Sequence, residues 1–162
     1  MTNAGPLARP TAATLWARVR GLLLAPSQEW RVIDAERPTL RMLFVRWVLP
    51  LTVFFFLAQT IGSMAFPMRV EGVASAPSAV RAISIIFFGT LFMLAGVWAT
   101  AWIIDRLAPA FGGRRDFMSA LKLAAYSGTG LWLSGVFGLF PAISLLGVVG
   151  IVSFYTLYRG LP

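Results

Sequence analysis

The sequence contains no cysteine and no histidine, and its 162 residues include a single lysine and six acidic residues. The absence of cysteine excludes disulfides, iron–sulfur clusters and thiolate metal sites. The absence of histidine removes the usual catalytic base and the commonest metal ligand. Charged residues make up only 12% of the chain, whereas a soluble domain has about a quarter. This scarcity of charge predicts an integral membrane protein, and we expect neither an enzyme nor a bound cofactor or metal.

The last third of the chain carries the longest uncharged stretch. The 36 residues between Lys122 and Arg159 contain no acidic, basic or histidine residue. One membrane crossing needs ~20 residues, so this stretch is too long for one helix and suits two. Pro141 lies near its middle and favours a tight turn after Phe140. We therefore predict a helical hairpin whose two charged ends lie on the same side of a bilayer.

The pattern of the whole chain predicts an all-α, polytopic transmembrane helical bundle. Hydrophobic residues make up 58% of the sequence, and the mean hydropathy is +0.78. Pro50 is expected to kink the first span because it removes an amide donor. Small residues such as Gly128 and Gly135 are expected to let the third helix pack closely against its neighbours. The four predicted spans cover residues 43–63, 83–104, 121–139 and 142–158.

Short amphipathic helices are expected to precede the spans. Residues 1–10 are small and polar and are predicted to be disordered. Residues 11–37 are predicted to form cytoplasmic or interfacial helices, and residues 38–162 the transmembrane domain. In the first helix, Val19 and Leu22 share a face and arginines flank it. This helix suits either a layer of anionic lipid headgroups or a position packed on the bundle.

The positive charge of the chain is unevenly distributed along it. The net charge is +8, and basic residues of membrane proteins collect in cytoplasmic loops. With the amino terminus inside, four crossings leave only Arg69 and Arg81 on the outer side. We therefore expect a cytoplasmic amino terminus. Nucleic-acid binding is not expected, because no arginine patch is interleaved with exposed stacking aromatics.

Three segments together resemble one known family. The first is LLLAPSQEWRVIDAERP, in which a proline and a Trp-x-x-Ile pattern lead into the first span. The second is AFGGRRDFMSALKLAAYSG, a basic loop that runs into Ala-Tyr-Ser. The third is FPAISLLGVVGIVSFYTLYRGLP, a proline-led helix that closes on Gly-Leu-Pro. Their order and spacing resemble the bacterial branch of the Yip1 family from about Leu22 onward.

The chain departs from the pattern of that family at two places. Family members commonly have a proline shortly after Ala-Tyr-Ser, where this chain has Gly128 and Gly130. They also continue past Gly-Leu-Pro into a further cytoplasmic turn and a fifth helix, whereas this sequence stops at Pro162. Either this is a short member or the sequence is truncated before the final helix, and we favour truncation.

The resemblance implies a multi-pass protein of the bacterial cytoplasmic membrane. Eukaryotic members act in the early secretory pathway with Rab GTPases, a machinery that bacteria lack. We therefore expect a non-enzymatic, membrane-organising or partner-binding scaffold. Its expected contacts are anionic headgroups at the arginine-rich amino-terminal segment and a membrane-protein partner or a second copy of the chain. The alternative is a subunit of a transporter or channel.

The residues expected to shape the protein lie in the family-like segments. Two glycines and an aspartate would form the second cytoplasmic loop, Tyr126 and Ser127 would follow it into the membrane, and Pro141 would set the hairpin turn. We interpret all of these candidates as structural determinants in preference to a partner-binding site. They are Gly112, Gly113, Asp116, Tyr126, Ser127, Pro141, Tyr158, Gly160 and Pro162.

Overall fold

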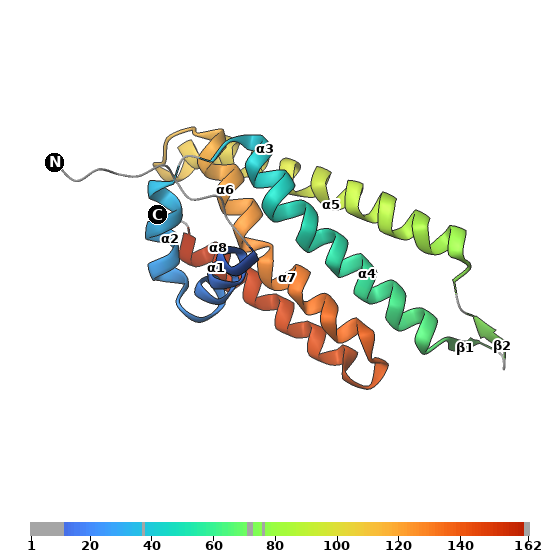
Figure 1. The fold of residues 1–162 in the computed structure, drawn as a ribbon. Helices are drawn as coiled ribbons and strands as arrows, with labels where there is room; N and C mark the ends of the chain where they lie inside the picture. Colours follow the sequence, from blue (N-terminus) through green and yellow to red (C-terminus); the bar gives the residue numbers. More distant parts are fainter. Residues whose placement is uncertain (1–11, 37, 71–72, 76, 161–162) are drawn as a thin grey trace.

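The computed structural model describes residues 12–36, 38–70, 73–75 and 77–160. It is a helical bundle, with one small β-hairpin at the far end of the long helices (Figure 1). The predicted disorder of residues 1–10 and the candidate Pro162 lie outside the described residues.

The first long hairpin of the bundle carries two helices that could cross a membrane. The first combines α3 (Leu40–Leu43), a π-helical turn (Phe44–Val48) and α4 (Leu49–Ala65). The second is α5 (Ala79–Leu107), which continues into a 3-10 turn, Ala108–Phe111. Leu40–Ala65 and Ala79–Phe111 are long and apolar enough to span a bilayer. They contain the spans predicted at 43–63 and 83–104 and extend beyond both.

The second hairpin differs from the prediction of two further unbroken spans. Its outgoing arm is divided into α6 (Phe117–Ser127), α7 (Thr129–Leu133) and a 3-10 segment, η3 (Ser134–Leu139). Its return arm is a 3-10 segment, η4 (Pro141–Ile151), followed by α8 (Val152–Gly160). Neither arm is one long α-helix, so the predicted four-span count is not confirmed. The many glycines of this stretch weaken an α-helix at several points.

The hairpin turn itself lies where the sequence predicts it. The backbone of Phe140 is extended, between the end of η3 at Leu139 and the start of η4 at Pro141. Figure 1 shows that this turn and the β-hairpin point away from the end at which the chain terminates. The two arms therefore lie on either side of this turn, as in a helical hairpin.

Pro50 changes the form of the first membrane helix in an identifiable way. The proline stands in the first turn of α4, immediately after the π-helical turn. Within that turn the amide of Leu49 donates to the carbonyl of Phe44, five residues earlier. A widened turn accommodates the missing amide and the ring of a proline inside a helix. The helix thus contains a π turn just before Pro50, where the sequence predicts a kink.

The segment between α4 and α5 contains a short β-hairpin that the sequence pattern did not predict. Strand β1 (Met68–Val70) pairs antiparallel with β2 (Val73–Ser75), with Met68 opposite Ser75. The Ser78 hydroxyl then accepts from the amide of Arg81 and caps α5.

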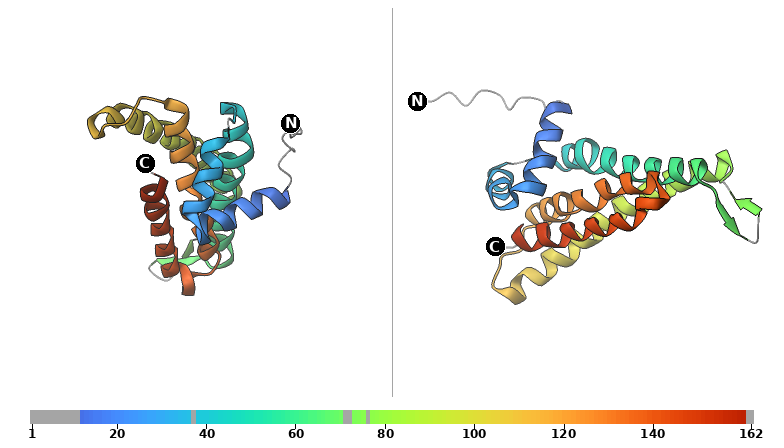
Figure 2. Two further views of the ribbon diagram at one scale, coloured as in Figure 1. Left: turned by 90° about the vertical axis from the view of Figure 1, so that its left-hand side faces the viewer. Right: turned by 90° about the horizontal axis from the view of Figure 1, so that it is seen from below.

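Two short helices cover the opposite end of the bundle, where both described ends of the chain lie. They are α1 (Ala12–Leu24) and α2 (Pro26–Ala35), and they run across the ends of the long helices (Figures 1 and 2). Their buried residues Val19, Leu22 and Ile33 belong to one core with Trp47 and Tyr126. Of the two positions left open for the first helix, the structure shows the one packed on the bundle.

Candidate functional site at the charged end of the bundle

Tyr126 lies at the centre of an aromatic cluster that joins α2 to the bundle. Its ring packs edge-on against Trp30, with centroids 6.4 Å apart and planes at 87°. Trp47 approaches from the first membrane helix, with its centroid 5.0 Å away. The indole of Trp30 donates to the carbonyl of Thr156 on α8 at 3.0 Å. The indole of Trp47 donates to the hydroxyl of Thr129 at 3.3 Å. The indole donors are thus satisfied inside an apolar cluster, as buried tryptophans require.

The positive charge of Arg18, on α1, interacts with two carboxylates and with the Tyr126 ring of the same cluster. Its guanidinium lies 3.3 Å from the carboxylate of Glu29 and also pairs with Glu36. It also lies 5.7 Å from the centre of the Tyr126 ring, over the ring face. All three charged side chains are partly buried, so this network is screened less than a surface ion pair. One arginine therefore connects α1, α2 and α6.

The single lysine of the chain closes the carboxyl-terminal end of α2. Lys122 is 93% buried, and its ammonium donates to the carbonyls of Ile33, Asp34 and Glu36 at 3.2–3.3 Å. The last carbonyls of a helix have no partner within it and carry partial negative charge. An ammonium has three donors, so the three carbonyls account for all of them. Lys122 thus fastens α2 to α6.

Gly160, the last residue of α8, lies against Trp30 of α2. A Cβ atom on Gly160 would lie 2.6 Å from Trp30 and 2.5 Å from Leu123. Only a glycine therefore lets α8 approach the tryptophan this closely. Next to it, the guanidinium of Arg159 donates to the Ser27 hydroxyl at the start of α2, with Nε at 3.1 Å. The three family-like segments of the sequence thus converge on α2.

The second predicted loop forms at the same end through a separate set of contacts. Gly112 has φ +81°, a left-handed conformation that glycine adopts without strain. The amide of Gly113 donates to the carbonyl of Ala108 at 2.9 Å. Asp116 caps α6, accepting from the Met118 and Ser119 amides at 3.0 and 3.4 Å and from the Ser119 hydroxyl at 2.6 Å. The hydroxyl of Ser119 is the main cause that lowers the pKa of this carboxyl below its ordinary value.

The remaining candidates lie elsewhere. Ser127 is buried beside Tyr126, at the point where α6 ends. Tyr158 is 71% exposed and is not part of the cluster. Pro141 opens η4 at the opposite end of the second hairpin. Sequence reasoning did not single out Arg18, Trp47 or Lys122 as site residues, although a lone lysine beside a 36-residue uncharged stretch was a usable signal.

This end of the bundle also holds a polar cleft of about 400 Å³. Its described lining is mostly hydrophilic and includes the buried Lys122. No group of three acidic residues able to hold a metal ion occurs in the described part of the chain. These contacts are suited to fixing α1 and α2 to the bundle and to presenting a surface formed by these two helices. The lining residues are Asp34, Glu36, Pro38, Asp116, Met118, Ser119 and Lys122.

Comparisons with known proteins identify similar sequences. The family model described as the Yip1 domain matches residues 20–162. The chain is 30% identical over 153 residues to the inner membrane protein YohC of Escherichia coli, in strain K12 and in strain O6:H1 (CFT073). That alignment covers 90% of this chain and 77% of YohC. No solved structure matches.

Together with the two apolar helices, this similarity supports a protein of a bacterial inner membrane. The family match covers the surface helix α2, the aromatic cluster and both hairpins. The chain belongs to the Yip1 domain family.

Proposed function

We propose that this protein is a non-enzymatic membrane scaffold. In this proposal, α1 and α2 form a cytoplasmic platform that is fixed to the membrane helices and contacts anionic lipid and a membrane-protein partner. The observation that carries the proposal is the attachment of α2 by Lys122, Trp30 and Arg18. A platform held by a buried ammonium, an indole hydrogen bond and a partly buried ion pair is positioned for contact with another molecule.

The exposed face of α1 has the composition that such a contact needs. Trp16 and Leu24 are 66% and 72% exposed, and Leu23 and Arg20 lie on the same arc of the helix. The face that carries Val19 and Leu22 is buried against the bundle. Apolar and aromatic side chains beside an arginine suit the headgroup layer. Helix α1 also lies across the direction of α4 and α5 (Figure 2), as a helix in the plane of a membrane surface does.

The distribution of basic residues supports a cytoplasmic position for this end. The far end holds Arg69 and Arg81. The positive-inside rule places the richer end in the cytoplasm, so we propose an amino terminus inside and four crossings. The basic residues described at the platform end are Arg18, Arg20, Arg31, Arg41, Arg46, Arg106, Arg114, Arg115, Lys122 and Arg159.

A photo-crosslinking amino acid placed at Leu24 in the full chain tests the scaffold in native membranes. We expect a discrete crosslinked protein, either a partner or a second copy. The matched control is Phe111, which is 85% exposed at the same end but outside the platform. Crosslinks that are absent at Leu24, or the same at Leu24 and Phe111, would refute the scaffold.

One feature favours the alternative, a transporter or channel subunit. The helix break between α6 and α7 resembles the discontinuous helices that line transport sites. The groove beside this break has no charged side chain in its described lining, which supports transport less. Flux in proteoliposomes well above that of a Pro50→Ala, Gly130→Leu double variant would favour transport over the scaffold.

A further inference from the structure

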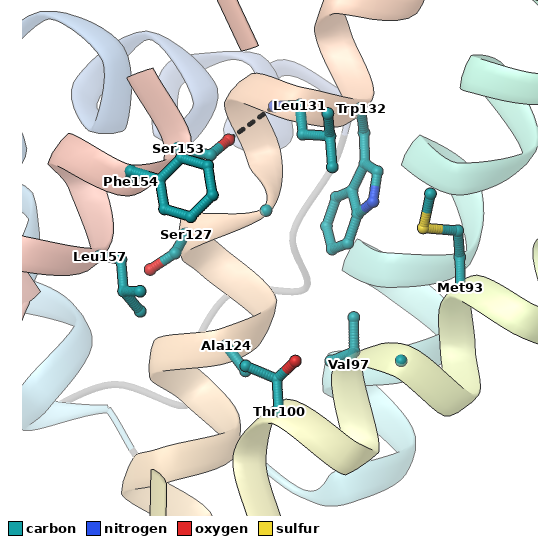
Figure 3. Close-up of a pocket in the computed structure, with 12 residues that line it drawn as sticks. Met93, Val97, Thr100, Ala124, Ser127, Leu131, Trp132, Ser153, Phe154 and Leu157 are labelled. Atoms are coloured by element: carbon teal, nitrogen blue, oxygen red, sulfur yellow. Dashed lines mark hydrogen bonds between the residues drawn. The ribbon is translucent and has the colours of Figure 1, made fainter. Parts of the chain in front are cut away.

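A groove of about 290 Å³ opens between α5 and the second hairpin, away from the platform. Its floor is formed by α6 and α7, one wall by α5 and the other by α8 (Figure 3). Along α5, Met93 and Gly96 lie farther from the charged end than Thr100 does. Ala124, on the floor, comes from α6, the part of the outgoing arm nearer the charged end. The lining is apolar apart from the hydroxyls of Thr100, Ser127 and Ser153.

We infer that this groove binds one acyl chain of a phospholipid, with an ester carbonyl of that lipid accepting from hydroxyls of the groove. The site lies apart from the platform of the proposed function and does not depend on it.

Ser127 is the hydroxyl that lacks a partner. The residue is 95% buried, lines the groove, and its Oγ has no hydrogen-bond partner among the described residues. Other helix hydroxyls of this hairpin are satisfied locally: Thr129 donates to the carbonyl of Tyr126, and Ser134 to that of Leu131. A buried hydroxyl without a partner is costly in an apolar medium. The carbonyl of a lipid ester is an acceptor of the right kind.

The break in the helix keeps the groove polar on one side. The amide of Leu131 donates to the Ser153 hydroxyl at 2.7 Å (Figure 3), whereas in an unbroken helix its acceptor would be the carbonyl of Ser127. A helix that continued without a break would leave fewer polar groups in the groove. Open space beside Gly96, where an added Cβ would meet nothing within 4 Å, forms the rest of the groove.

The dimensions favour an acyl chain over a transmembrane helix. From Met93 to Thr100 the groove follows α5 for about 10 Å, at 1.5 Å per residue. A docked helix would use the full hydrocarbon thickness of ~30 Å, whereas one leaflet offers about half of that. Trp98 and Trp102 flank Thr100 on α5 and are 46% and 50% exposed. Exposed tryptophans mark the interfacial layer, which contains the lipid esters.

Two glycines provide a matched pair for the test. A Cβ at Gly96 or at Gly147 would meet nothing within 4 Å, so a side chain added at either position starts in open space. Leucine at position 96 fills the groove, whereas position 147 on η4 is outside it. The full chain is reconstituted with a phospholipid that carries a photoreactive diazirine in its acyl chain, and crosslinked peptides are identified by mass spectrometry.

We expect wild-type crosslinks to concentrate on residues 93–100 and 153–157. Gly96→Leu should reduce them roughly tenfold, and Gly147→Leu should leave them unchanged. Equal labelling of wild type and Gly96→Leu would overturn the inference. Labelling spread evenly over the exposed face of α5, with no preference for the groove, would also overturn it.

Ser127→Ala tests the inference by two measurements, thermal stability and lipid labelling, which should respond differently. Removing an unsatisfied hydroxyl should leave the lipid-free protein at least as stable to heat. The same substitution should reduce labelling in the groove roughly fivefold, the effect of one lost hydrogen bond. Unchanged labelling by Ser127→Ala would overturn the assignment of the ester to this hydroxyl.

Discussion

Replacing Lys122 with methionine should release α2 from the bundle. Methionine keeps most of the length and apolar contact of lysine but has no donor. It would leave the carbonyls of Ile33, Asp34 and Glu36 without the ammonium that binds them at 3.2–3.3 Å. These carbonyls lie at the negative end of α2, so the substitution also removes a favourable interaction with the helix dipole.

The size of the effect follows from the burial of each bond. Only the bond to Ile33 is fully buried, and those to Asp34 and Glu36 are partly buried. An orphaned buried carbonyl costs about 1–3 kcal/mol, and water can replace part of the other two bonds. A charge at a helix end adds about 0.5–1 kcal/mol, while relief of the buried ammonium offsets part of the loss. We expect a net loss of about 2–3 kcal/mol in the docking of α2.

Hydrogen exchange of the α2 amides, followed by mass spectrometry in lipid nanodiscs, measures this docking energy. A loss of 2–3 kcal/mol corresponds to roughly 30- to 150-fold faster exchange of α2. Lys122→Arg should fall between wild type and Lys122→Met, because a planar guanidinium does not direct three donors from one point.

The control is Arg115→Met, which removes one positive charge from an exposed side chain at the same end. It should leave the exchange of α2 unchanged. Unchanged α2 exchange in Lys122→Met, or equal acceleration in Arg115→Met, would refute the reasoning that a specific ammonium clamp holds the platform.

The chain has no cysteine, so Ala79→Cys and Ala110→Cys each introduce a unique labelling site. A membrane-impermeant maleimide should modify the cysteine at position 79 in intact cells and the cysteine at position 110 only after permeabilisation. The reverse pattern would show the inverted topology. Gly112→Ala should lower stability by about 1 kcal/mol because φ is +81°, measured by thermal unfolding against Gly147→Ala, which should change little. Asp116→Asn should destabilise α6 near neutral pH. Since the pKa of Asp116 in the folded protein lies below its ordinary value, the ionised carboxylate stabilises the fold at pH values above that ordinary value. This stabilisation is lost as the pH falls through the folded pKa. The thermal difference between wild type and Asp116→Asn should therefore shrink in acid, and a constant difference would contradict the sign.

The order of elements could be predicted because each depends on local chemistry. Hydropathy identified the first two membrane helices, and Asp116, expected in the second cytoplasmic loop, lies at the start of α6 as its cap. The helix breaks in the second hairpin could not be predicted from composition alone. At the break after Ser127, the amide of Leu131 donates to the hydroxyl of Ser153, which lies 22 residues further along the chain. A partner at that distance leaves no periodic signal in the sequence.

The candidate site was predictable in its parts but not in its assembly. Trp30, Tyr126 and Gly160 were all present in the family-like segments, yet nothing in their spacing places them together. Lys122 fastens α2 to α6 beside them, and its acceptors are backbone carbonyls 86 to 89 residues away. Every residue type offers a backbone carbonyl, so the sequence does not mark these acceptors. The β-hairpin was missed for a simpler reason, since strands of three residues are too short for an alternating pattern.

The basic residues at the platform end divide into two groups that respond differently to salt. Arg18 and Lys122 are engaged with carboxylates or carbonyls in partly or fully buried positions. Exposed residues such as Arg20, Arg31 and Arg114 face water, and each attracts an anionic surface by about 1 kcal/mol. Salt screens exposed charges over ~10 Å at 0.1 M but affects buried pairs much less. Rising ionic strength should therefore weaken contact between the platform and anionic lipid while leaving α2 docked, because the residues that hold the platform differ from those that the platform presents.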